Sequence, residues 1–437
     1  MHAHRRAHRE SARARARLGG NVDGARAERR GDDDLRGVGA LPGGGNAVDR
    51  ARGQGDRHGR AGVDHGRLVA SRTVAYRTDF SVDGRAEQDP ARWWDAVVRA
   101  SRDLAEACRT RDATIGCISF SGQMQGAVLL DAAGRPVRPA IIWADTRARA
   151  ESEALIQRVG EYRAYGITGH RLNATYTLPK LMWVRQHEPH VWAKVRAVSQ
   201  AKDFAAYRLT GRLATDPSDA SGTDAFDQTS GQWSPELLDA AGIDRALLPE
   251  IVPSTTILGG VTAEAAGQTG LTAGTPVVIG GGDGACAALG AGLVSASSGT
   301  NAYLGSSAWI SLVSERPLHD KALRTMTFNH VVPAQFVPTA TMQAGGASLE
   351  WVVETLGAAG DSERFDALLA SAAGVEAADD GLFFLPHLLG ERSPHWNPRA
   401  RGVFVGLARR HGPAHLVRAV LEGVAFNLRT CVLAFEE

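Results

Sequence analysis

One carboxylate in this sequence stands where charge and bare backbone could act together on a bound molecule. Asp283 directly follows three glycines at positions 280–282. Glycine has no Cβ, so a ligand can approach the main chain there, and an aspartate at that place can take a proton from it. We therefore predict that Asp283 is a catalytic base facing a bound substrate. The alternative is a glycine-rich turn in which Asp283 only caps the following helix.

The turn at 121–126 offers amide groups at another strand end. Its sequence is Ser-Gly-Gln-Met-Gln-Gly, with Gln123, Met124 and Gln125 at its centre, directly after an apolar run. Amides donate hydrogen bonds to hydroxyl groups and accept hydrogen bonds from them. The turn therefore indicates contact with a ligand rich in hydroxyls, such as a sugar.

Trp143 and Asp145 follow a further apolar run and complete the predicted sugar contacts. An indole face can cover the C–H edges of a sugar, and a carboxylate can accept hydrogen bonds from its hydroxyls. Arg147 adds a donor two residues later. In the alternative interpretation, Trp143 belongs to the core and Asp145 caps the next helix. For Asp145 considered by itself, the cap is the favoured role.

Two glycine-containing turns in the second half could bind the phosphates of a nucleotide. The first lies between two alternating runs, and such a turn presents N–H groups and hydroxyls to a phosphate. The second precedes an apolar helical run, and the N-terminus of a helix favours anions. The predicted nucleotide contacts are Gly305, Ser306 and Ser307 in the first turn and Gly345, Gly346 and Ser348 in the second. A plain hairpin and a glycine-rich helix start are the alternatives.

These residues need elements that hold them in place, and the apolar pattern predicts strands before several of the turns. Short runs rich in β-branched residues are typical of buried strands. The expected strands are 68–76, 114–120, 127–131, 140–143 and 277–279. Helices are expected from Asp89-Pro90 to Cys108, after Arg147, after Asp283 and at 415–435. Strands alternating with helices in this way indicate an open α/β sheet. Ligands of open α/β sheets bind beyond the carboxyl ends of the strands, where the predicted site residues stand.

Length and composition limit the class of protein. A chain of 437 residues is too long for one ordinary core, so two domains are expected. The 49 Lys and Arg residues balance 48 Asp and Glu residues, which gives no argument for nucleic acid or a membrane. The four cysteines form no CxxC pair, which fits a reducing cytoplasm and argues against disulfides or zinc. No run of about 18 apolar residues indicates a membrane span.

Residues 1–66 differ from the rest. They contain no Ile, Phe, Trp, Tyr or Cys and show no period of 2 or 3.6. Such a segment cannot bury enough apolar surface to offset its ordering entropy, so we expect disorder. A basic nucleic-acid arm and an Arg-rich transit peptide both fit poorly with the acidic run at 32–34. Translation out of frame or from a wrong start is the hypothesis we favour.

Several motifs, in order along the chain, resemble the FGGY family of carbohydrate kinases. The run Tyr-Thr-Leu-Pro-Lys-Leu-Met-Trp-Val-Arg-Gln-His at 176–187 is similar to the first family signature, and parts of 402–422 are similar to the second. Residues 280–283 resemble the catalytic-aspartate motif and 303–307 the second phosphate loop. Stretches similar to the xylulokinase branch occur at 86–94, 122–126 and 218–223. The resemblance covers residues 67–437.

The resemblance implies an ATP- and Mg²⁺-dependent kinase for a sugar hydroxyl, with D-xylulose as the expected substrate. The implied fold is α/β, with two actin-like, ribonuclease-H-like domains and a cleft between them. Residues 67–274 would bind the sugar and 275–437 the nucleotide. Gly284 joins Asp283 among the expected substrate contacts. Sugar and ATP are the expected partners, with no nucleic acid, no membrane and no metal site of the protein's own; a homodimer stays open.

Three departures from the family pattern limit these expectations. The family begins with a strand and a phosphate turn where residues 1–66 stand, and it usually continues past Glu437 with a turn that seats the adenine. The fold is therefore expected to be incomplete at both ends. Xylulokinases commonly carry His where Gln125 stands. A family kinase for ribulose, fuculose, gluconate or glycerol stays open, as does a non-catalytic sugar-binding remnant.

Overall fold

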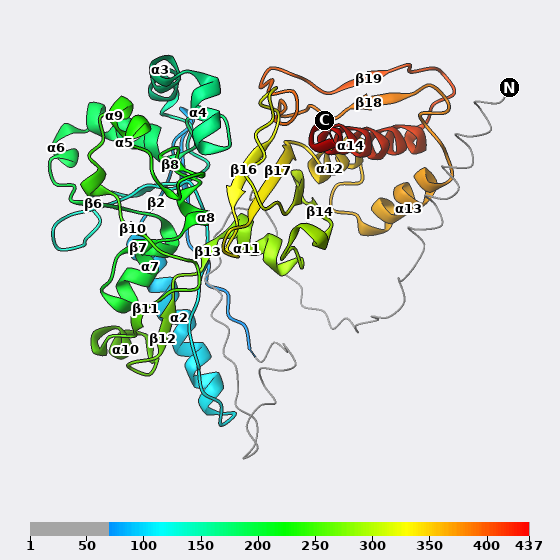
Figure 1. Cartoon of the computed structure of the whole chain (residues 1–437). Helices are drawn as coiled ribbons and strands as arrows, with labels where there is room; N and C mark the ends of the chain where they lie inside the picture. Colours follow the sequence, from blue (N-terminus) through cyan, green and yellow to red (C-terminus); the bar gives the residue numbers. More distant parts are fainter. Residues whose placement is uncertain (1–69, 437) are drawn as a thin grey trace. The chain divides into compact units, whose positions relative to one another are not determined.

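The computed structural model describes residues 70–436 (Figure 1). The segment 1–66, predicted to be disordered or out of frame, lies outside the described residues. The described helices are α2 (Pro90–Arg109), α3 (Arg149–Val159), α4 (Glu161–Thr168), α5 (Thr177–His187), α6 (Pro189–Trp192), α7 (Ala201–Thr210), α8 (Pro217–Ala220), α9 (Pro235–Ala241), α10 (Ala263–Thr269), α11 (Asp283–Gly290), α12 (Gly346–Thr355), α13 (Ser362–Ala373) and α14 (Pro413–Glu436). Two 3-10 turns are η1 (Arg245–Leu247) and η2 (Ala296–Ser298).

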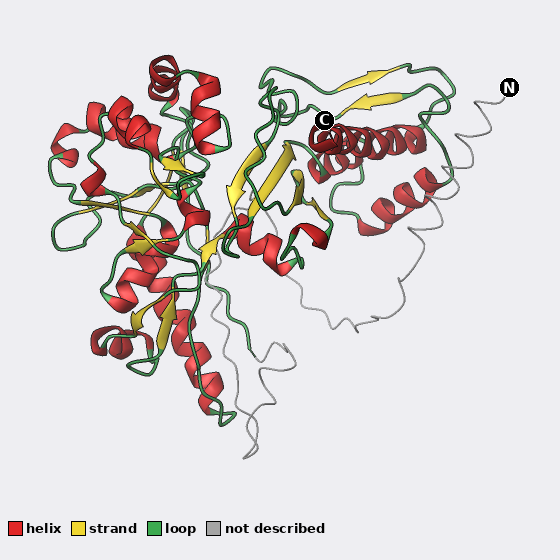
Figure 2. Ribbon diagram, viewed as in Figure 1, coloured by secondary structure: helices red, strands yellow, loops and turns green. Residues whose placement is uncertain are grey.

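The strands are mostly short and appear in Figure 2 as small arrows among loops. They are β1 (Asp79–Phe80), β2 (Ala86–Gln88), β3 (Ser121–Gly122), β4 (Val128–Leu130), β5 (Ala140–Ile141), β6 (Ala197–Ser199), β7 (Ala214–Thr215), β8 (Phe226–Asp227), β9 (Gln232–Trp233), β10 (Glu250–Ile251), β11 (Ile257–Gly260), β12 (Pro276–Val278), β13 (Gly281–Gly282), β14 (Thr300–Leu304), β15 (Ala308–Leu312), β16 (Met326–Asn329), β17 (Phe336–Met342), β18 (Phe383–Leu385) and β19 (Val403–Val405). The predicted strands at 127–131, 140–143 and 277–279 are confirmed in place by β4, β5 and β12.

Helix α2 begins as its sequence predicts. The Asp89 side chain accepts a hydrogen bond from the N–H of Ala91, and Pro90 occupies the first turn, where its missing N–H costs nothing. The helix buries Trp94 and Val97 against Val277 of β12. This packing couples the first predicted domain to the strand that leads to Asp283. The division at residues 274 and 275 stays a prediction.

Two predicted strands do not form. Residues 70–76 contain no strand, and 114–120 contains only an isolated bridge between Ile118 and Val277. Alternation or an apolar run is not enough, because a strand exists only where a neighbour pairs with its N–H and C=O groups over several residues. On the described part of the chain, 114–120 is hydrogen-bonded along one edge alone, by Pro276, Val278 and Gly281.

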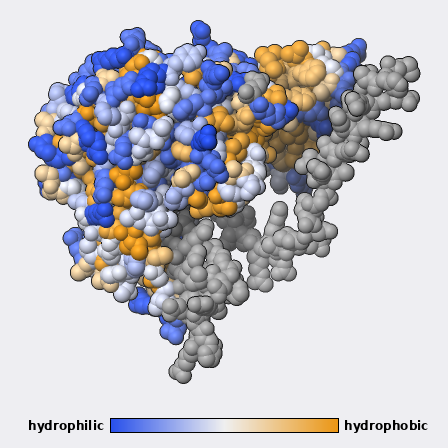
Figure 3. All heavy atoms as spheres, viewed as in Figure 1, coloured by the Kyte–Doolittle hydropathy of each residue, from blue (hydrophilic) through white to orange (hydrophobic). Residues whose placement is uncertain are grey.

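The four-stranded antiparallel sheet β14-β15-β17-β16 forms the centre of the second half. Helix α14 packs against β15, β17 and β18, as its amphipathic pattern predicts. The ribbon β18–β19 pairs Phe384 with Phe404 and turns the alternate side chains outward. The exposed apolar side chains there are Phe383, Leu385, Val403 and Val405. Figure 1 labels β18 and β19 at the upper right, where Figure 3, in the same view, shows an orange area. None of the described helices is long and apolar enough to cross a membrane.

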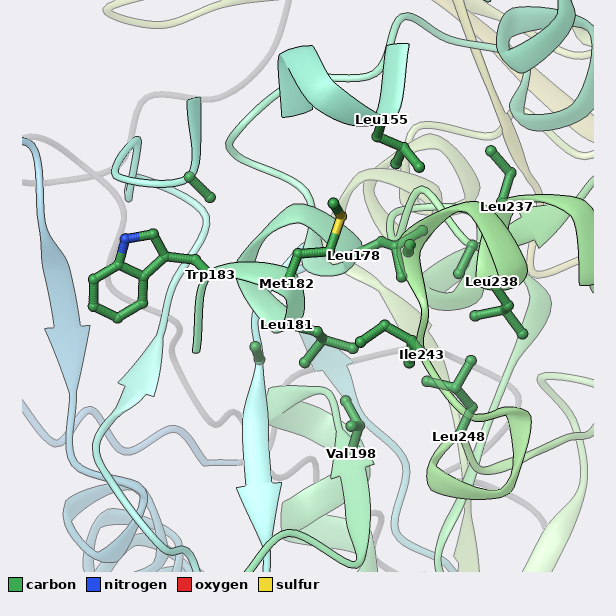
Figure 4. Packing of buried hydrophobic residues seen from close by; sticks show 14 of the residues in the cluster. Leu155, Leu178, Leu181, Met182, Trp183, Val198, Leu237, Leu238, Ile243 and Leu248 are labelled. Atoms are coloured by element: carbon green, nitrogen blue, oxygen red, sulfur yellow. The ribbon is translucent and has the colours of Figure 1, made fainter. Parts of the chain in front are cut away.

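The largest core of the first half surrounds α5 (Figure 4). The helix is buried from Thr177 through Val184, so it is apolar on nearly every side except at Lys180. Leucines of α3 and α9 pack on one side of α5, and Val198 of β6 lies close by. The core therefore holds α5 firmly and, with it, a lysine in the middle of apolar surroundings.

Candidate active site

Asp283 stands at the end of β13, where that strand meets the predicted sugar turn. The parallel pair β13–β3 aligns Gly281 with Ser121 and Gly282 with Gly122. Asp283 and Gln123 are the next residues on the two strands, so their backbones leave the pair side by side. Asp283 is the first residue of α11, and the N-cap is Gly282. The alternative role of Asp283 as a helix cap is therefore wrong. Its Oδ1 accepts one hydrogen bond, 2.9 Å long, from the N–H of Gly284.

The surroundings of Asp283 favour a base that works near neutral pH. The side chain reaches solvent, yet protein atoms crowd around it. This desolvation raises the pKa of Asp283 to about 6, against the lowering effect of the hydrogen bond from Gly284. A carboxylate with a pKa just below the working pH is deprotonated there and binds a proton more strongly than an ordinary aspartate does.

A buried hydrogen-bond relay holds the backbone just before Asp283. The Ser218 hydroxyl accepts a hydrogen bond of 2.9 Å from the N–H of Gly282 and donates to Asp216. Asp216 also accepts from the hydroxyl of Ser254, at 2.7 Å, and pairs with Lys202 at 2.9 Å. Burial would raise the pKa of Asp216, but Lys202 and the two hydroxyls hold it below its ordinary value. Asp216 is therefore a fixed anion.

A second buried carboxylate, Asp219, lies in the same group. Lys202 approaches it at 3.4 Å, while its own oxygens have no hydrogen-bond donor among the described residues. Burial raises the pKa of Asp219 well above its ordinary value, and the nearby carboxylates of Asp216 and Asp283 add to that rise. Lys202 is thus shared among three buried carboxylates, those of Asp203, Asp216 and Asp219.

Glycines allow the two strand ends to meet so closely. A Cβ on Gly282 would lie 2.6 Å from Cγ of Met124, and a Cβ on Gly122 would lie 2.6 Å from Cβ of Lys202. Such distances leave no room for any side chain. Met124 is thus packed against the backbone that carries Asp283 and lies within 3.7 Å of where a Cβ of Gly284 would stand.

Gln123 presents a hydrogen-bond acceptor beside Asp283. Its amide nitrogen donates to Oε1 of Gln88 at 2.9 Å, and Trp93 donates to the same oxygen. The other amide atom, Oε1 of Gln123, is buried and finds no partner among residues 70–436. A buried acceptor of this kind needs a donor, and contact of Gln123 with a sugar hydroxyl stays a prediction.

Trp143 and Asp145 lie in different environments. Trp143 is half-buried and packs against the core that includes Trp93. Asp145 is fully buried: it accepts hydrogen bonds from the N–H of Ala86 at 2.7 Å and from the Arg147 guanidinium at 2.6 Å. The N-cap of α3 is Ala148, so Asp145 does not cap that helix as the alternative supposed. Substrate contact by Trp143 and Asp145 stays a prediction.

The two predicted nucleotide turns lie against each other. The hairpin turn between β14 and β15 contains Gly305, Ser306 and Ser307, and α12 begins just after Gly345. The N–H of Gly346 donates to the carbonyl of Gly305 at 2.7 Å, and the N–H of Gly345 donates to that of Ser306 at 2.9 Å. These donors are therefore occupied inside the protein. Gly345 and Gly346 support the turn, while the N–H groups of Ser306 and Ser307 bond to nothing among the described residues.

Ser348 and Glu391 form buried hydrogen bonds next to the second predicted nucleotide turn. The Ser348 hydroxyl is buried and donates to the carbonyl of Ala344. Glu391 accepts from the N–H of Gln343 at 2.9 Å and from the Asn427 amide of α14 at 2.8 Å. Glu391 also pairs with His387 rather than with the side chain of its neighbour Arg392. The buried carboxylate of Glu391 therefore connects the segment before α12 to α14.

Sequence reasoning missed the residues behind the turns: Lys180, Lys202, Asp216, Ser218 and Ser254. The sequence has four lysines, and only the structure shows that two of them, Lys180 and Lys202, are buried. Among residues 70–436 no group of three or more His, Cys, Asp and Glu side chains could hold a metal ion. Within residues 70–436 no hydrogen bond is recorded between the residues 121–126 or Asp283 and the two predicted nucleotide turns at 305–307 and 345–348.

Comparison with known proteins gives the family. Residues 59–290 match the N-terminal domain and residues 300–437 the C-terminal domain of the FGGY family of carbohydrate kinases. The xylulose kinase of Lactococcus lactis is 37% identical over 83% of this chain and 72% of its own. The gluconokinase of Bacillus subtilis is 29% identical over 86% and 74%. The crystal structure of the Rhodospirillum rubrum xylulose kinase matches with a TM-score of 0.80 and 32% identity, over 84% and 74%. The chain belongs to the FGGY family of carbohydrate kinases.

Proposed function

We propose that this FGGY carbohydrate kinase phosphorylates D-xylulose to D-xylulose 5-phosphate. The observation that carries the proposal is the parallel pairing of β3 and β13, which brings the Gln123 turn beside Asp283. Similarity to xylulose kinases at 37% identity favours the ketopentose. Gln123, Met124 and Gln125 would bind the sugar, with Trp143, Asp145 and Gly284 as further contacts.

Asp283 would act as the general base. A sugar hydroxyl is a poor nucleophile at neutral pH, and a carboxylate within hydrogen-bond reach can take its proton as the bond from oxygen to phosphorus forms. The pKa of about 6 leaves Asp283 ionised at neutral pH and ready for that proton. Gln123 would hold another hydroxyl through its unpartnered Oε1, which fixes the sugar beside the base.

FGGY kinases use ATP, which supplies the phosphoryl group. The residues that would hold the phosphates are Ser306 and Ser307 of the hairpin turn, because their N–H groups have no other partner among the described residues. Gly305 would allow close approach, while Gly345, Gly346 and Ser348 would keep the turn in place. Mg²⁺ would enter with ATP. We further propose that the two halves are actin-like domains that enclose the reactants.

A sugar acid is the second candidate substrate. The similarity to a gluconokinase, at 29% identity, supports it. Gln125 also stands where xylulokinases commonly carry His, and a neutral amide pairs with hydroxyls without the positive charge that His can gain. Xylulose, ribulose, gluconate and glycerol therefore belong in one substrate panel.

The test is turnover of the purified chain with ATP and this panel, measured as ADP formation and by the ³¹P spectrum of the product. Asp283→Asn should lower kcat by about 10²–10⁴-fold, since general-base help is of that size. The dissociation constant for the sugar should change little, because the amide still fits the same space.

In the wild-type chain, kcat/KM should rise as the pH passes through about 6, where Asp283 loses its proton. Undiminished turnover in the Asp283→Asn variant would refute the role of the base. Sugar binding without any ATP turnover in the wild-type chain would favour a non-catalytic remnant. Turnover of gluconate in preference to xylulose would replace the proposed substrate.

A further inference from the structure

Lys180 is a buried cation that the proposed reaction leaves unexplained. It lies in the middle of α5, and its side chain has no exposed surface. Its ammonium group donates three hydrogen bonds to main-chain carbonyls: 2.7 Å to Gln125, 2.8 Å to Ile142 and 2.6 Å to Thr175. Within residues 70–436 no ion pair between Lys180 and a carboxylate is recorded. The lysine therefore binds backbone alone.

Two of the three carbonyls belong to segments that carry predicted sugar contacts, and the third, that of Thr175, lies just before α5. Gln125 is the last predicted contact of the sugar turn, and Ile142 directly precedes Trp143. The bridge between Ala127 and Ile141 already brings these two segments together. Lys180 Nζ thus sits where the two sugar-side segments and the start of α5 meet, and it connects all three.

The sugar turn needs such support. Gln125 has φ of 65°, a left-handed conformation that a non-glycine residue adopts at a cost. Such a conformation persists only where the surroundings fix it. The carbonyl of Gln125 accepts its hydrogen bond from Lys180, which fixes the peptide plane that follows Gln125.

The lysine is an unfavourable choice for stability alone. Burial lowers its pKa to about 7, with Asp145 and Asp224 opposing the fall and Arg147 adding to it. At pH values between about 7 and 10.5, the pKa of an ordinary lysine, this side chain is protonated in the unfolded chain and largely neutral in the folded chain. The unfolded chain therefore binds more protons there. Stability from this group therefore rises with pH across that window, and below it the full cost of burying the charge is present. Stability alone therefore does not account for Lys180, which leaves the positioning of its three carbonyls as the role to test.

We propose that Lys180 is a positioning residue for the sugar: its ammonium group holds the carbonyls of Gln125 and Ile142 so that the turn and Trp143 present one binding surface. The inference rests on the proposed sugar-kinase function. Lys180 does not touch the reactants, so the base and the nucleotide turn should be unaffected by its loss.

The experiment compares Lys180→Met with Lys194→Met in the full chain. Methionine keeps the length of the side chain without the donors, and Lys194 is an exposed lysine close in sequence. Hydrogen exchange by mass spectrometry should show at least about tenfold faster exchange at 121–126 and 142–146 in Lys180→Met only. The KM for the sugar should rise by at least about tenfold, while the KM for ATP stays within about twofold.

Exchange and sugar KM equal to those of Lys194→Met would overturn the positioning role. The exchange measurement needs no turnover, so an inactive wild-type chain would refute the kinase proposal and still test Lys180.

The wild-type chain supplies a second test if Lys180→Met does not fold. An uncharged amine has only two N–H donors for three carbonyls, so the KM for the sugar should rise above pH about 7. The groups that face Lys180 are Asp145, Arg147 and Asp224. The nearby His170 has a pKa of about 4 and stays neutral in this range, and Asp283, at about 6, is already ionised. A sugar KM that is constant from pH 6.5 to 9 would contradict the proposal.

Discussion

Ser218 gives the sharpest test of how the fold positions Asp283. Its hydroxyl joins the N–H of Gly282 to the carboxylate of Asp216, and it is fully buried. Ser218→Ala removes both hydrogen bonds and adds no bulk. The N–H of Gly282 then has no partner among the described residues, and the backbone just before Asp283 loses its side-chain hydrogen bond.

The expected cost follows from these contacts. A hydrogen bond to a charged group contributes about 1.5–3 kcal/mol, and a buried N–H left unpaired costs about 1–3 kcal/mol. Because the two losses share one site, we expect the free energy of unfolding to fall by about 2–4 kcal/mol. A displacement of a catalytic group by about 1 Å costs up to about 10²-fold in rate, so kcat should fall by about 10–100-fold.

Ser254→Ala is the matched control. Ser254 donates to the same oxygen of Asp216 at 2.7 Å, and its hydroxyl makes no hydrogen bond to Gly282. Loss of the Ser254 hydroxyl should lower the free energy of unfolding, measured by chemical denaturation, by about 1.5–3 kcal/mol, which is close to the effect of Ser218→Ala. The kcat should fall by less than about threefold. Equal kcat values for the two variants would refute the view that Ser218 positions the base.

Three further outcomes are expected. Gly345→Ala should raise the KM for ATP by at least about fivefold at unchanged sugar KM, because its Cβ would lie 2.9 Å from that of Ala308 and would displace the hairpin turn. Glu391→Ala should lower the free energy of unfolding by about 3–5 kcal/mol and Glu391→Gln by less, since Asn427 keeps an acceptor; equal losses by calorimetry would contradict this. The native chain binds more protons than the unfolded chain between pH 3.8 and about 6, so ionised Asp283 costs stability above that window. Asp283→Asn should therefore melt above the wild-type chain at pH 7.5, and the difference should vanish near pH 4.

Local chemistry made several elements predictable. Asp89-Pro90 specifies the start of α2 by side-chain capping and a fixed φ, and both act within one turn of the chain. Helix α14 follows from its apolar spacing. The prediction of a strand at 114–120 was wrong, because whether a strand forms depends on which neighbours pair with it and not only on its own residues.

The candidate site divides in the same way. Asp283 and the turn at 123–125 could be proposed from sequence because glycines and polar side chains after apolar runs are visible there, and the pairing of β3 with β13 that brings them together is visible only in the structure. That Asp145 points inward was hidden, since its partners Ala86 and Arg147 depend on tertiary contacts. The residues that hold the turns were hidden for the same reason: a lysine that donates to three carbonyls looks in sequence like any other lysine.

The two buried lysines suggest why this site tolerates so much unfavourable burial. Lys202 fixes Asp216 and, through Ser218, the backbone before the base; Lys180 fixes the sugar turn. Each cation acts on main chain at one of the two paired strand ends. Two-residue strands such as β3 and β13 have few hydrogen bonds of their own. Charge-assisted hydrogen bonds from the core supply the rigidity that such short strands lack, at a cost in stability that apolar residues would avoid. Replacing Lys180, which binds main-chain carbonyls, by an apolar residue would therefore test positioning more directly than stability, whereas loss of Lys202 would leave the buried carboxylates of Asp203, Asp216 and Asp219 without their cation.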